Sequence, residues 1–284
     1  FHLSHSQIND INGVWTILDT NIKYNHISGI SASTFISSNS LNSKFLNKLY
    51  DGGFIDNETK NSVSLQKMNS LGNKDIANIY YCYNPDSAGK TGYRVGLSYN
   101  NSRSMKFSDD IYKLIFFGNK QFAGKKADLS NFAFNTLSYN SIQFGIFNHL
   151  KQDNDNLSYY IGFSLISASD FESVEIANSS LYTAETGEYL DLDLQMGYSS
   201  VDTVNNALYE FNGIGAAIDI QSIYHNREHN YLVRLDINNI GFIKWKKQSF
   251  HIMLDTSRKY EGLVIDYVFD MDNNDFSDIN IDSI

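Results

Sequence analysis

Residues 93–99 read YRVGLSY, an alternation of large apolar side chains with small or polar ones. A period of two residues is typical of a β-strand whose two faces meet different surroundings. The same period returns in residues 159–165 and 190–198, and in the second of these one face carries Asp191, Asp193 and Gln195. A dry interior accepts such side chains only with hydrogen-bond partners. The pattern therefore predicts strands of a membrane-spanning β-barrel, apolar outside and wet inside.

The position of a charge predicts which face meets lipid. An arginine on the lipid-facing surface of a barrel costs about 2–4 kcal/mol at mid-depth of the bilayer. We therefore expect one face to point to lipid (Tyr93, Val95, Leu97 and Tyr99) and the other to point to the lumen (Arg94, Gly96 and Ser98).

Composition agrees with long strands and argues against some partners. The 284 residues include nineteen Tyr, nineteen Phe and a single Pro, which suits unbroken strands and interfacial aromatic girdles. No stretch approaches the roughly eighteen consecutive apolar residues of a transmembrane helix. The formal net charge of −10, without clusters of Lys and Arg, argues against nucleic acid, because phosphate binding needs concentrated positive charge.

The rest of the chain reads mostly as strands. A long strand or hairpin is expected in residues 13–35, with Val14, Ile17 and Leu18 among its apolar residues. Turn residues then separate further predicted strands at about 75–84, 92–101, 130–139, 141–150, 157–168, 171–179, 188–199, 213–225, 230–239, 248–256 and 262–269.

Helical spacing interrupts this pattern in two places. Residues 38–73 predict a helical insert, with one helix that ends at Gly52 and Gly53 and a second that runs from the cap Asp56 to Leu71. Residues 108–117 predict a short helix with Ser108 as its N-cap and Gly118 at its end. Its stripe of Ile111, Leu114 and Ile115 is expected to be buried.

Two glycine motifs resemble nucleotide-binding loops but lack the necessary context. Gly89, Lys90 and Thr91 end like a phosphate-binding loop, yet a strand follows where a helix should begin, so a hairpin turn is expected. Gly213 and Gly215 form half of a dinucleotide fingerprint, but the following residues continue as a strand. Small residues on a crowded barrel wall are the preferred interpretation there.

Metal and thiol chemistry are also weakly supported. Asp270, Asp272 and Asn274 imitate the start of a calcium loop, which breaks where Gly and a bidentate Glu are required, so a solvated acidic segment is expected. His225 and His229 flank a polar turn that reads as an exposed loop. Cys82, the only cysteine, is expected to be an inert packed thiol. We expect no catalytic, cofactor-binding or metal-ligating residues, and no cofactor.

Three segments together resemble a family of Bacteroidota outer-membrane β-barrel proteins of unknown function, related in architecture to FadL-like barrels and to barrel subunits of type IX secretion. The segments are residues 112–129 with Gly118 and Gly124, the glycine-bearing run from Gly213 to Asp219, and the run from Asp236 to Trp245. The resemblance implies an all-β fold, an antiparallel transmembrane β-barrel of about 12–14 strands with short helices in its connections.

Residues 1–284 are accordingly expected to form a single outer-membrane β-barrel domain with the helical insert at about 38–73. Members of the family that this chain resembles continue with further strands, so we expect either that C-terminal strands are missing here or that a partner completes the barrel. The start at Phe1 is expected to follow a cleaved signal peptide.

The leading functional hypothesis is a non-enzymatic barrel of the bacterial outer membrane, a subunit of an envelope or secretion-associated complex. Its partners would be outer-membrane lipids and other envelope protein subunits. One alternative is an outer-membrane channel for small or hydrophobic solutes. Another is a soluble or surface-attached β-sandwich that binds glycan or protein, which predicts that the aromatic faces pack in a core. A hydrolase is the weakest alternative, because no catalytic constellation is visible.

Overall fold

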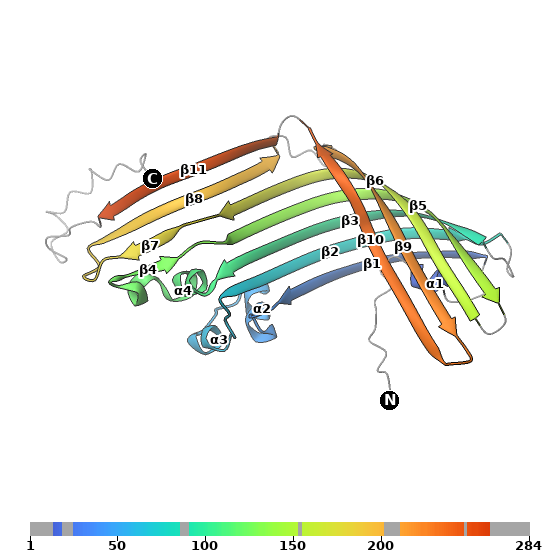
Figure 1. Cartoon of the computed structure of the whole chain (residues 1–284), viewed down its shortest axis with the longest axis horizontal. Helices are drawn as coiled ribbons and strands as arrows, with labels where there is room; N and C mark the ends of the chain where they lie inside the picture. Colours follow the sequence, from blue (N-terminus) through green and yellow to red (C-terminus); the bar gives the residue numbers. More distant parts are fainter. Residues whose placement is uncertain are drawn as a thin grey trace.

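A single antiparallel sheet dominates the computed structural model, which describes residues 14–18, 25–85, 91–152, 155–201, 211–246 and 249–261 (Figure 1). Its strands are β1 (His26–Ser38), β2 (Met68–Tyr83), β3 (Thr91–Ser108), β4 (Lys125–Asp128), β5 (Phe132–Gln152), β6 (Asp155–Ile176), β7 (Ser180–Thr183), β8 (Tyr189–Val201), β9 (Gly213–Asn226), β10 (Tyr231–Trp245) and β11 (Ser249–Glu261). The helices are α1 (Val14–Leu18), α2 (Ser43–Tyr50), α3 (Asn57–Asn61), α4 (Asp109–Phe117) and the 3₁₀ turn η1 (Asn119–Phe122).

The sheet is a meander that forks at β6. β1, β2, β3, β5 and β6 lie side by side in that order. Residues 155–168 of β6 then pair with β9, whereas its residues 172–176 pair with β8. β10 continues the sheet beyond β9, and β11 continues it beyond β8. β8 and β9 therefore act as two halves of one interrupted strand, and so do β10 and β11, which diverge in Figure 1.

The two ends of the sheet differ in the length of their connections. At one end, which we call the turn end, the strands are joined by residues 84–90, 153–154 and 227–230. At the other end, the cap end, residues 39–67, 109–131 and 177–188 join them and contain α2, α3, α4 and the short paired strands β4 and β7. Figure 1 shows these three helices, which we call the helical cap, gathered at the ends of β1 to β3.

Helix α1 reveals that the sheet is curled at the turn end. Its Val14, Ile17 and Leu18 form one buried cluster with side chains of β2, β5 and β6, and Ile27 of β1 and Ile223 of β9 pack against it. In a flat sheet β1 and β9 would lie about 24 Å apart, whereas a five-residue helix is about 7.5 Å long. A single cluster can join them because the sheet curves around α1.

Several expected strand boundaries were wrong. Residues 130–139 and 141–150 form one continuous strand, β5, and residues 157–168 and 171–179 belong to the single strand β6, which ends at Ile176. The register shifts at Ser138/Tyr139, where Ser169 of β6 is the extra residue. A polar run that reads as a turn is thus a β-bulge, which lets both strands continue. The strand expected at 262–269 lies outside the described residues.

The N-terminal expectation and half of the helical insert also need correction. Residues 14–18 form α1, so the strand predicted over 13–35 begins only at His26. In the insert, α2 ends before Gly52 as expected and Asp56 caps α3, but α3 stops at Asn61 and β2 begins at Met68. Of the apolar residues in this region, Leu71 lies on β2, and both Leu65 and Leu71 pack against the buried cluster of the cap.

Helix α4 agrees with its predicted boundaries. Ser108 is the N-cap, Asp109 and Asp110 lie in the first turn, and Gly118, with a φ of 79°, ends the helix. Ile111 is buried, Leu114 is half-buried, and Ile115 is 66 % exposed, so the expected burial of Ile115 was wrong. Tyr112 and Phe116 pack instead against Phe45 of α2, and burial raises the pKa of Tyr112 to about 12.

Replacement of the α4 cap gives a first prediction. The Ser108 hydroxyl accepts the Ile111 amide hydrogen at 3.2 Å and donates to the Asp128 carbonyl at 2.7 Å. We expect Ser108→Ala to lower the free energy of unfolding by about 1 kcal/mol, because the first turn loses its capping acceptor. Ser104→Ala, on the exposed part of the same strand, should change it by less than about 0.5 kcal/mol. Denaturant titration measures both, and equal effects would contradict the capping role.

The all-β antiparallel architecture predicted from the sequence is confirmed, with eleven strands in the described part of the chain. The predicted closure is not seen there. Among the described strands β1 pairs only with β2, and β10 and β11 pair only with β9 and β8, so the sheet is open between these edges.

Candidate functional site: an apolar outer belt and a filled inner face

The register assigns each strand residue to one of two faces. Leu97 of β3 stands opposite Ile79 of β2 and Ile142 of β5, and Ile142 stands opposite Leu165 of β6. We call the face that carries Leu97 the outer face. The opposite face carries Arg94 and α1, and we call it the inner face.

The outer face carries a continuous band of large apolar side chains over seven strands, which we call the outer belt. These side chains are between 38 % and 81 % exposed, so no other part of the described chain covers them. The outer belt comprises Ile30, Ile79, Tyr81, Tyr83, Tyr93, Val95, Leu97, Tyr99, Ile142, Phe144, Ile146, Ile161, Phe163, Leu165, Ile214, Ile218, Ile240 and Phe242.

Strand β3 shows the two faces most clearly. Tyr93 and Tyr99 lie at the ends of the belt segment, about 20 Å apart along the strand, with Val95 and Leu97 between them. All four are exposed, whereas Arg94 on the inner face is 2 % exposed. The predicted partition of this strand into an apolar outer and a polar inner face is therefore confirmed. The apolar row of β8 lies on the same outer face but is half-buried.

A row of polar side chains borders the outer belt on the cap side. Thr34 of β1 donates to the Asp75 carboxylate at 2.8 Å, and the Asn101 amide donates to the same carboxylate at 3.4 Å. Ser138 of β5 in turn donates to the Asn101 side-chain oxygen at 3.1 Å. The outer surface thus changes from apolar to polar directly beyond Tyr99, across four neighbouring strands.

The inner face at the level of the belt is filled by an arginine layer. The Arg94 guanidinium donates to the Gln143 side-chain oxygen at 2.9 Å and lies 5.6 Å and 5.8 Å from the ring centres of Tyr80 and Tyr160. Gly145 makes room for this arrangement, because a Cβ there would lie 2.3 Å from the Tyr160 ring. Such cation–π contacts are strongest where water is excluded.

A second polar group lies beside this layer on β9 and β10. The Asp219 carboxylate accepts the backbone N–H of Asn239 at 2.7 Å, and the Gln221 amide donates to Asp236 at 3.0 Å and to Asn238 at 2.6 Å. Asp219 and Gln221 are 5 % and 2 % exposed. The Asp219 carboxylate and the Gln221 amide nitrogen are therefore hydrogen-bonded, as burial favours.

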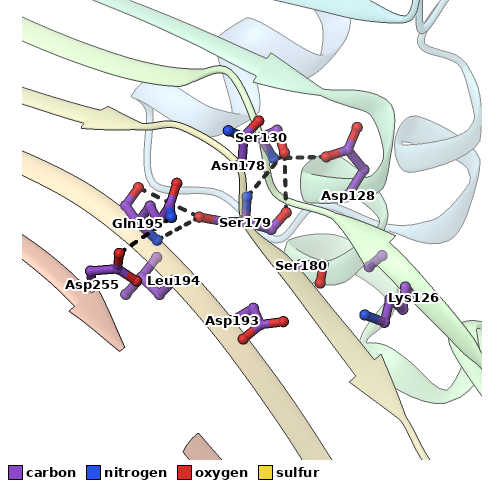
Figure 2. A pocket seen from close by; sticks show the side chains of 11 residues that line it. Lys126, Asp128, Ser130, Asn178, Ser179, Ser180, Asp193, Leu194, Gln195 and Asp255 are labelled. Carbon is purple, nitrogen blue, oxygen red and sulfur yellow. Dashed lines mark hydrogen bonds between the residues drawn. The ribbon is translucent and has the colours of Figure 1, made fainter. Parts of the chain in front are cut away.

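The inner face also carries a polar cavity of about 540 Å³ near the cap end, where β4, β7, β8 and β11 meet (Figure 2). Ser179 joins its walls: its N–H donates to the Ser130 hydroxyl at 3.1 Å, and its hydroxyl accepts the Gln195 N–H at 2.9 Å. Asp128, Asp193 and Asp255 supply acceptors around it. No group of three His, Cys, Asp or Glu side chains able to hold a metal ion occurs among the described residues.

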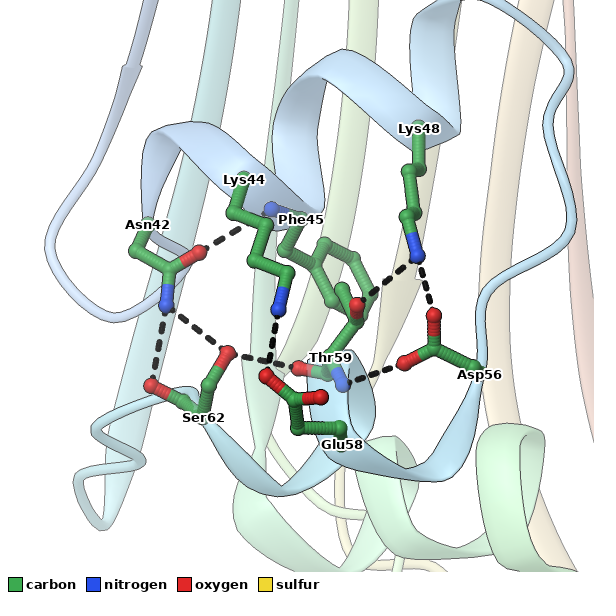
Figure 3. A network of polar contacts seen from close by, with 8 residues as sticks. All are labelled: Asn42, Lys44, Phe45, Lys48, Asp56, Glu58, Thr59 and Ser62. Carbon is green, nitrogen blue, oxygen red and sulfur yellow. Dashed lines mark hydrogen bonds and ion pairs between the residues drawn. The ribbon is translucent and has the colours of Figure 1, made fainter.

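The helical cap is held together by charged and amide side chains (Figure 3). Lys48 of α2 donates to the Asp56 carboxylate and, at 3.0 Å, to the Thr59 hydroxyl of α3. Asp56 also accepts the Thr59 backbone N–H at 2.8 Å. Lys44 pairs with Glu58 at 2.7 Å. These contacts fix two short helices that would be marginal alone.

Acid should loosen this cap. The hydrogen bond from Lys48, with that from Thr59, lowers the pKa of Asp56 well below its ordinary value of 3.8. The stabilisation is therefore complete above about pH 4 and is lost as the pH falls towards the lowered pKa. We expect pepsin cleavage within residues 43–61 to rise steeply below pH 4. Asp56→Asn should flatten this dependence and Asp51→Asn should preserve it; a steep rise in Asp56→Asn would contradict the assignment.

Gly213, Gly215 and Cys82 lie in surroundings that agree with the sequence predictions. Gly213 and Gly215 lie on β9, and a Cβ at Gly215 would lie 2.2 Å from the Phe242 carbonyl oxygen, so the interpretation as a crowded wall is confirmed. Cys82 is 2 % exposed in the cluster around α1, as expected for a packed thiol. Gly89 and Lys90 lie outside the described residues, and Thr91 begins β3.

Of the candidate metal ligands, only His225 and His229 lie in the part of the chain that the structure describes. His225 lies near the end of β9, and His229 lies in the exposed turn to β10, where its backbone N–H donates to Asn226 at 2.7 Å. Asp270, Asp272 and Asn274 lie outside the described residues. None of the described helices is long and apolar enough to cross a membrane.

The sequence analysis predicted neither the left-handed bulge at Asn239 nor helix α1. Asn238 and Asn239 form a bulge in β10, where Asn239 adopts a left-handed φ of 54°. Two consecutive asparagines within an otherwise apolar strand were the available signal, because asparagine tolerates this conformation. The five residues of α1 gave no such signal, since a short apolar run fits a helix or a strand equally.

No curated protein and no solved structure matches this chain significantly. Residues 13–284 match the family described as "Family of unknown function (DUF5723)". Because this match includes nearly the whole sequence, the protein belongs to the DUF5723 family.

Proposed function

We propose that the protein is a non-enzymatic β-barrel of the bacterial outer membrane that serves as a subunit of an envelope or secretion-associated complex. The observation that carries the proposal is the outer belt. A contiguous exposed apolar surface of this extent is unusual on a soluble monomer. Its aliphatic centre between tyrosines on β3, and the polar row beyond Tyr99, match the banding of a lipid-facing barrel wall.

The two ends of the sheet support an orientation in the membrane. Outer-membrane barrels have short periplasmic turns and longer extracellular loops. The turn end would then lie in the periplasm, and the helical cap would lie outside the cell. Closure of the barrel would require strands or a partner at the edges formed by β1 and by β10 and β11, because open edges in lipid leave backbone groups unpaired.

The inner face favours a subunit over an open channel. α1 and the layer around Arg94 fill the space within the curved sheet at the turn end. Apolar side chains are also exposed on the helical cap, beyond the outer belt, where Phe54 is 85 % and Tyr50 is 45 % exposed. Such side chains outside the bilayer support contact with another protein.

The β-sandwich alternative has less support. It requires the aromatic strand faces to pack in a core, whereas the outer belt is exposed and the packed face carries arginine, glutamine and aspartate.

Labelling of cysteines introduced one at a time tests the membrane placement. Leu97→Cys and Ser98→Cys occupy neighbouring positions of β3 on opposite faces, and native Cys82 is buried in both. We expect Leu97→Cys to react with a membrane-soluble maleimide and to resist a charged one in intact outer membranes. Solubility without detergent, or equal reaction of Leu97→Cys with both reagents, would contradict the proposal.

Gentle detergent extraction distinguishes the subunit hypothesis from the channel alternative. We expect the protein to migrate with a stoichiometric partner in native mass spectrometry and to conduct no ions in a planar bilayer. Phe54→Ser should weaken the partner's retention, whereas Lys67→Ser, on an exposed polar residue outside α2 and α3, should not. Recovery of a monomer without a partner that conducts ions would contradict the subunit hypothesis and support the channel alternative.

A further inference from the structure

Strand β1 forms one edge of the sheet, because in the described part of the chain it pairs only with β2. It is 13 residues long, whereas strands of globular proteins most often have about 5–6 residues. Its sequence, HISGISASTFISS, contains no Lys, Arg, Asp, Glu or Pro, and its pairing with β2 has no bulge. Proteins protect free edges with charges, prolines, bulges or short strands, and β1 has none of these devices.

The opposite edge, formed by β10 and β11, is protected. β10 carries three charged residues and the bulge at Asn238 and Asn239, and β11 carries four charged residues. A long strand without such protection is a template for pairing with another chain. The contrast between the two edges therefore identifies β1 as the edge that receives a further strand.

The backbone groups of β1 that face this edge follow from one hydrogen bond. The Asn84 N–H donates to the Asn25 carbonyl at 2.8 Å, directly beside the pair of His26 with Tyr83. Hydrogen-bonded pairs alternate along an antiparallel ladder, so the odd-numbered residues 27–37 bond to β2. The even-numbered residues 28–38 therefore direct their N–H and C=O groups to the free edge. Groups of this kind need partners, above all in lipid.

We propose that β1 receives an antiparallel strand from another protein of the complex. This assignment rests on the proposed function, because it names how the partner binds. All pairings between the described strands are antiparallel, and a strand antiparallel to β1 runs from the cap end to the turn end. β10 and β11 run in the same direction as β1, so this direction also suits antiparallel pairing with them.

A second copy of the chain does not fit this edge in a membrane. Antiparallel pairing of two β1 strands would place the two helical caps on opposite sides of the bilayer. Copies that insert in one orientation therefore cannot supply the strand to each other, and the partner is a different protein.

The two faces of β1 specify the sequence of the added strand. On the outer face Ile30 is 81 % exposed, so the partner residues beside it must be apolar to continue the outer belt. On the inner face a Cβ at Gly29 would lie 2.4 Å from the Tyr80 hydroxyl oxygen, so the Tyr80 ring covers this position. Odd-numbered residues of β1 would form the close, non-hydrogen-bonded pairs with the new strand, so the residue opposite Gly29 is small. The partner segment thus alternates apolar and small residues.

Photo-cross-linking tests the direction of the added strand. p-Benzoylphenylalanine is introduced at one position at a time, at Ser28, Ala32 or Ile36 of β1, in the cells that produce the protein. We expect all three positions to cross-link to one segment of one other protein, in reverse order and about four residues apart. The control position is Ala77 of β2, which stands opposite Ala32 and one strand further from the edge, and it should give no such cross-link.

A proline replacement tests the hydrogen bonds of the edge. Ala32→Pro removes an N–H that faces the free edge but none that bonds to β2, so β2 should keep its amide hydrogen-exchange protection. We expect it to abolish the cross-links from positions 28 and 36, whereas Ala32→Ser, which keeps the N–H, should preserve them. If β2 lost its protection in Ala32→Pro, the order of the cross-links in the chain without proline would still decide.

Several outcomes would overturn the proposal. They are cross-links to a second copy or to residues 262–284 of the same chain, a parallel order, an absence of cross-links, and cross-links that survive Ala32→Pro in a folded sheet. Native mass spectrometry and the labelling of Leu97→Cys test the subunit and its membrane placement separately. A partner that binds elsewhere is therefore distinguished from the absence of a partner.

Discussion

Leu97→Arg should lower the free energy of unfolding in a bilayer by about 2–4 kcal/mol, the cost of a charge at mid-depth on a lipid-facing wall. Leu97 is 54 % exposed in the centre of the outer belt. In water, an arginine at so exposed a position would change stability by less than about 0.5 kcal/mol. The two surroundings of the same side chain therefore predict different results. Reversible unfolding in lipid vesicles, followed by tryptophan fluorescence, measures the difference.

A matched replacement controls for the charge itself. Ile36 of β1 is 40 % exposed and, like Leu97, lies on the outer face of the sheet. It lies beyond Thr34 and therefore beyond the polar row. Ile36→Arg should leave the unfolding free energy within about 1 kcal/mol of wild type. If Leu97→Arg were as mild as Ile36→Arg, the outer belt would not face lipid.

Gly241→Ala should destabilise the protein by about 1–3 kcal/mol, through strain between β9 and β10. A Cβ at this position would lie 2.1 Å from the Ala216 carbonyl oxygen and 2.7 Å from the Ala217 Cα. Both are backbone atoms of the neighbouring strand, so no side-chain rotation relieves the overlap. β10 would have to move away from β9, its only partner strand among the described residues. Denaturant titration and amide hydrogen exchange of β10 measure the effect.

Gly72→Ala is the control for Gly241→Ala. Gly72 also lies within a paired strand, but its nearest atom to an added Cβ is the Ser37 hydroxyl oxygen at 3.4 Å. Alanine is better than glycine within a strand by roughly 0.5–1 kcal/mol, so Gly72→Ala should be neutral or slightly stabilising. Equal destabilisation by both replacements would show that general strand propensity, and not close approach, governs these sites.

Local chemistry accounts for what the sequence predicted well. The alternation around Arg94 identified the two faces because a strand places successive side chains on opposite sides. The cap at Ser108 and the stop at Gly118 were predictable because each satisfies a requirement of the adjacent helix.

Long-range packing accounts for what the sequence did not reveal. Whether Tyr139 and Ser169 form a bulge or a turn depends on the register between β5 and β6, which no local window contains. The burial of Val14 against β5 and β6 depends on the curvature of the whole sheet.

The fork at β6 also constrains the order in which the chain can assemble. β9 and β10 are joined by four residues, 227–230, and can pair as a local hairpin at little entropic cost. β8 and β11 are separated in sequence by that entire hairpin, so their pairing from Val201 with Ser249 onward closes a much longer loop. Prior formation of the hairpin shortens the effective loop. We therefore expect β8 and β11 to pair only after the β9–β10 hairpin has formed. The rate at which the hairpin turn forms then limits the rate at which β11 joins the sheet.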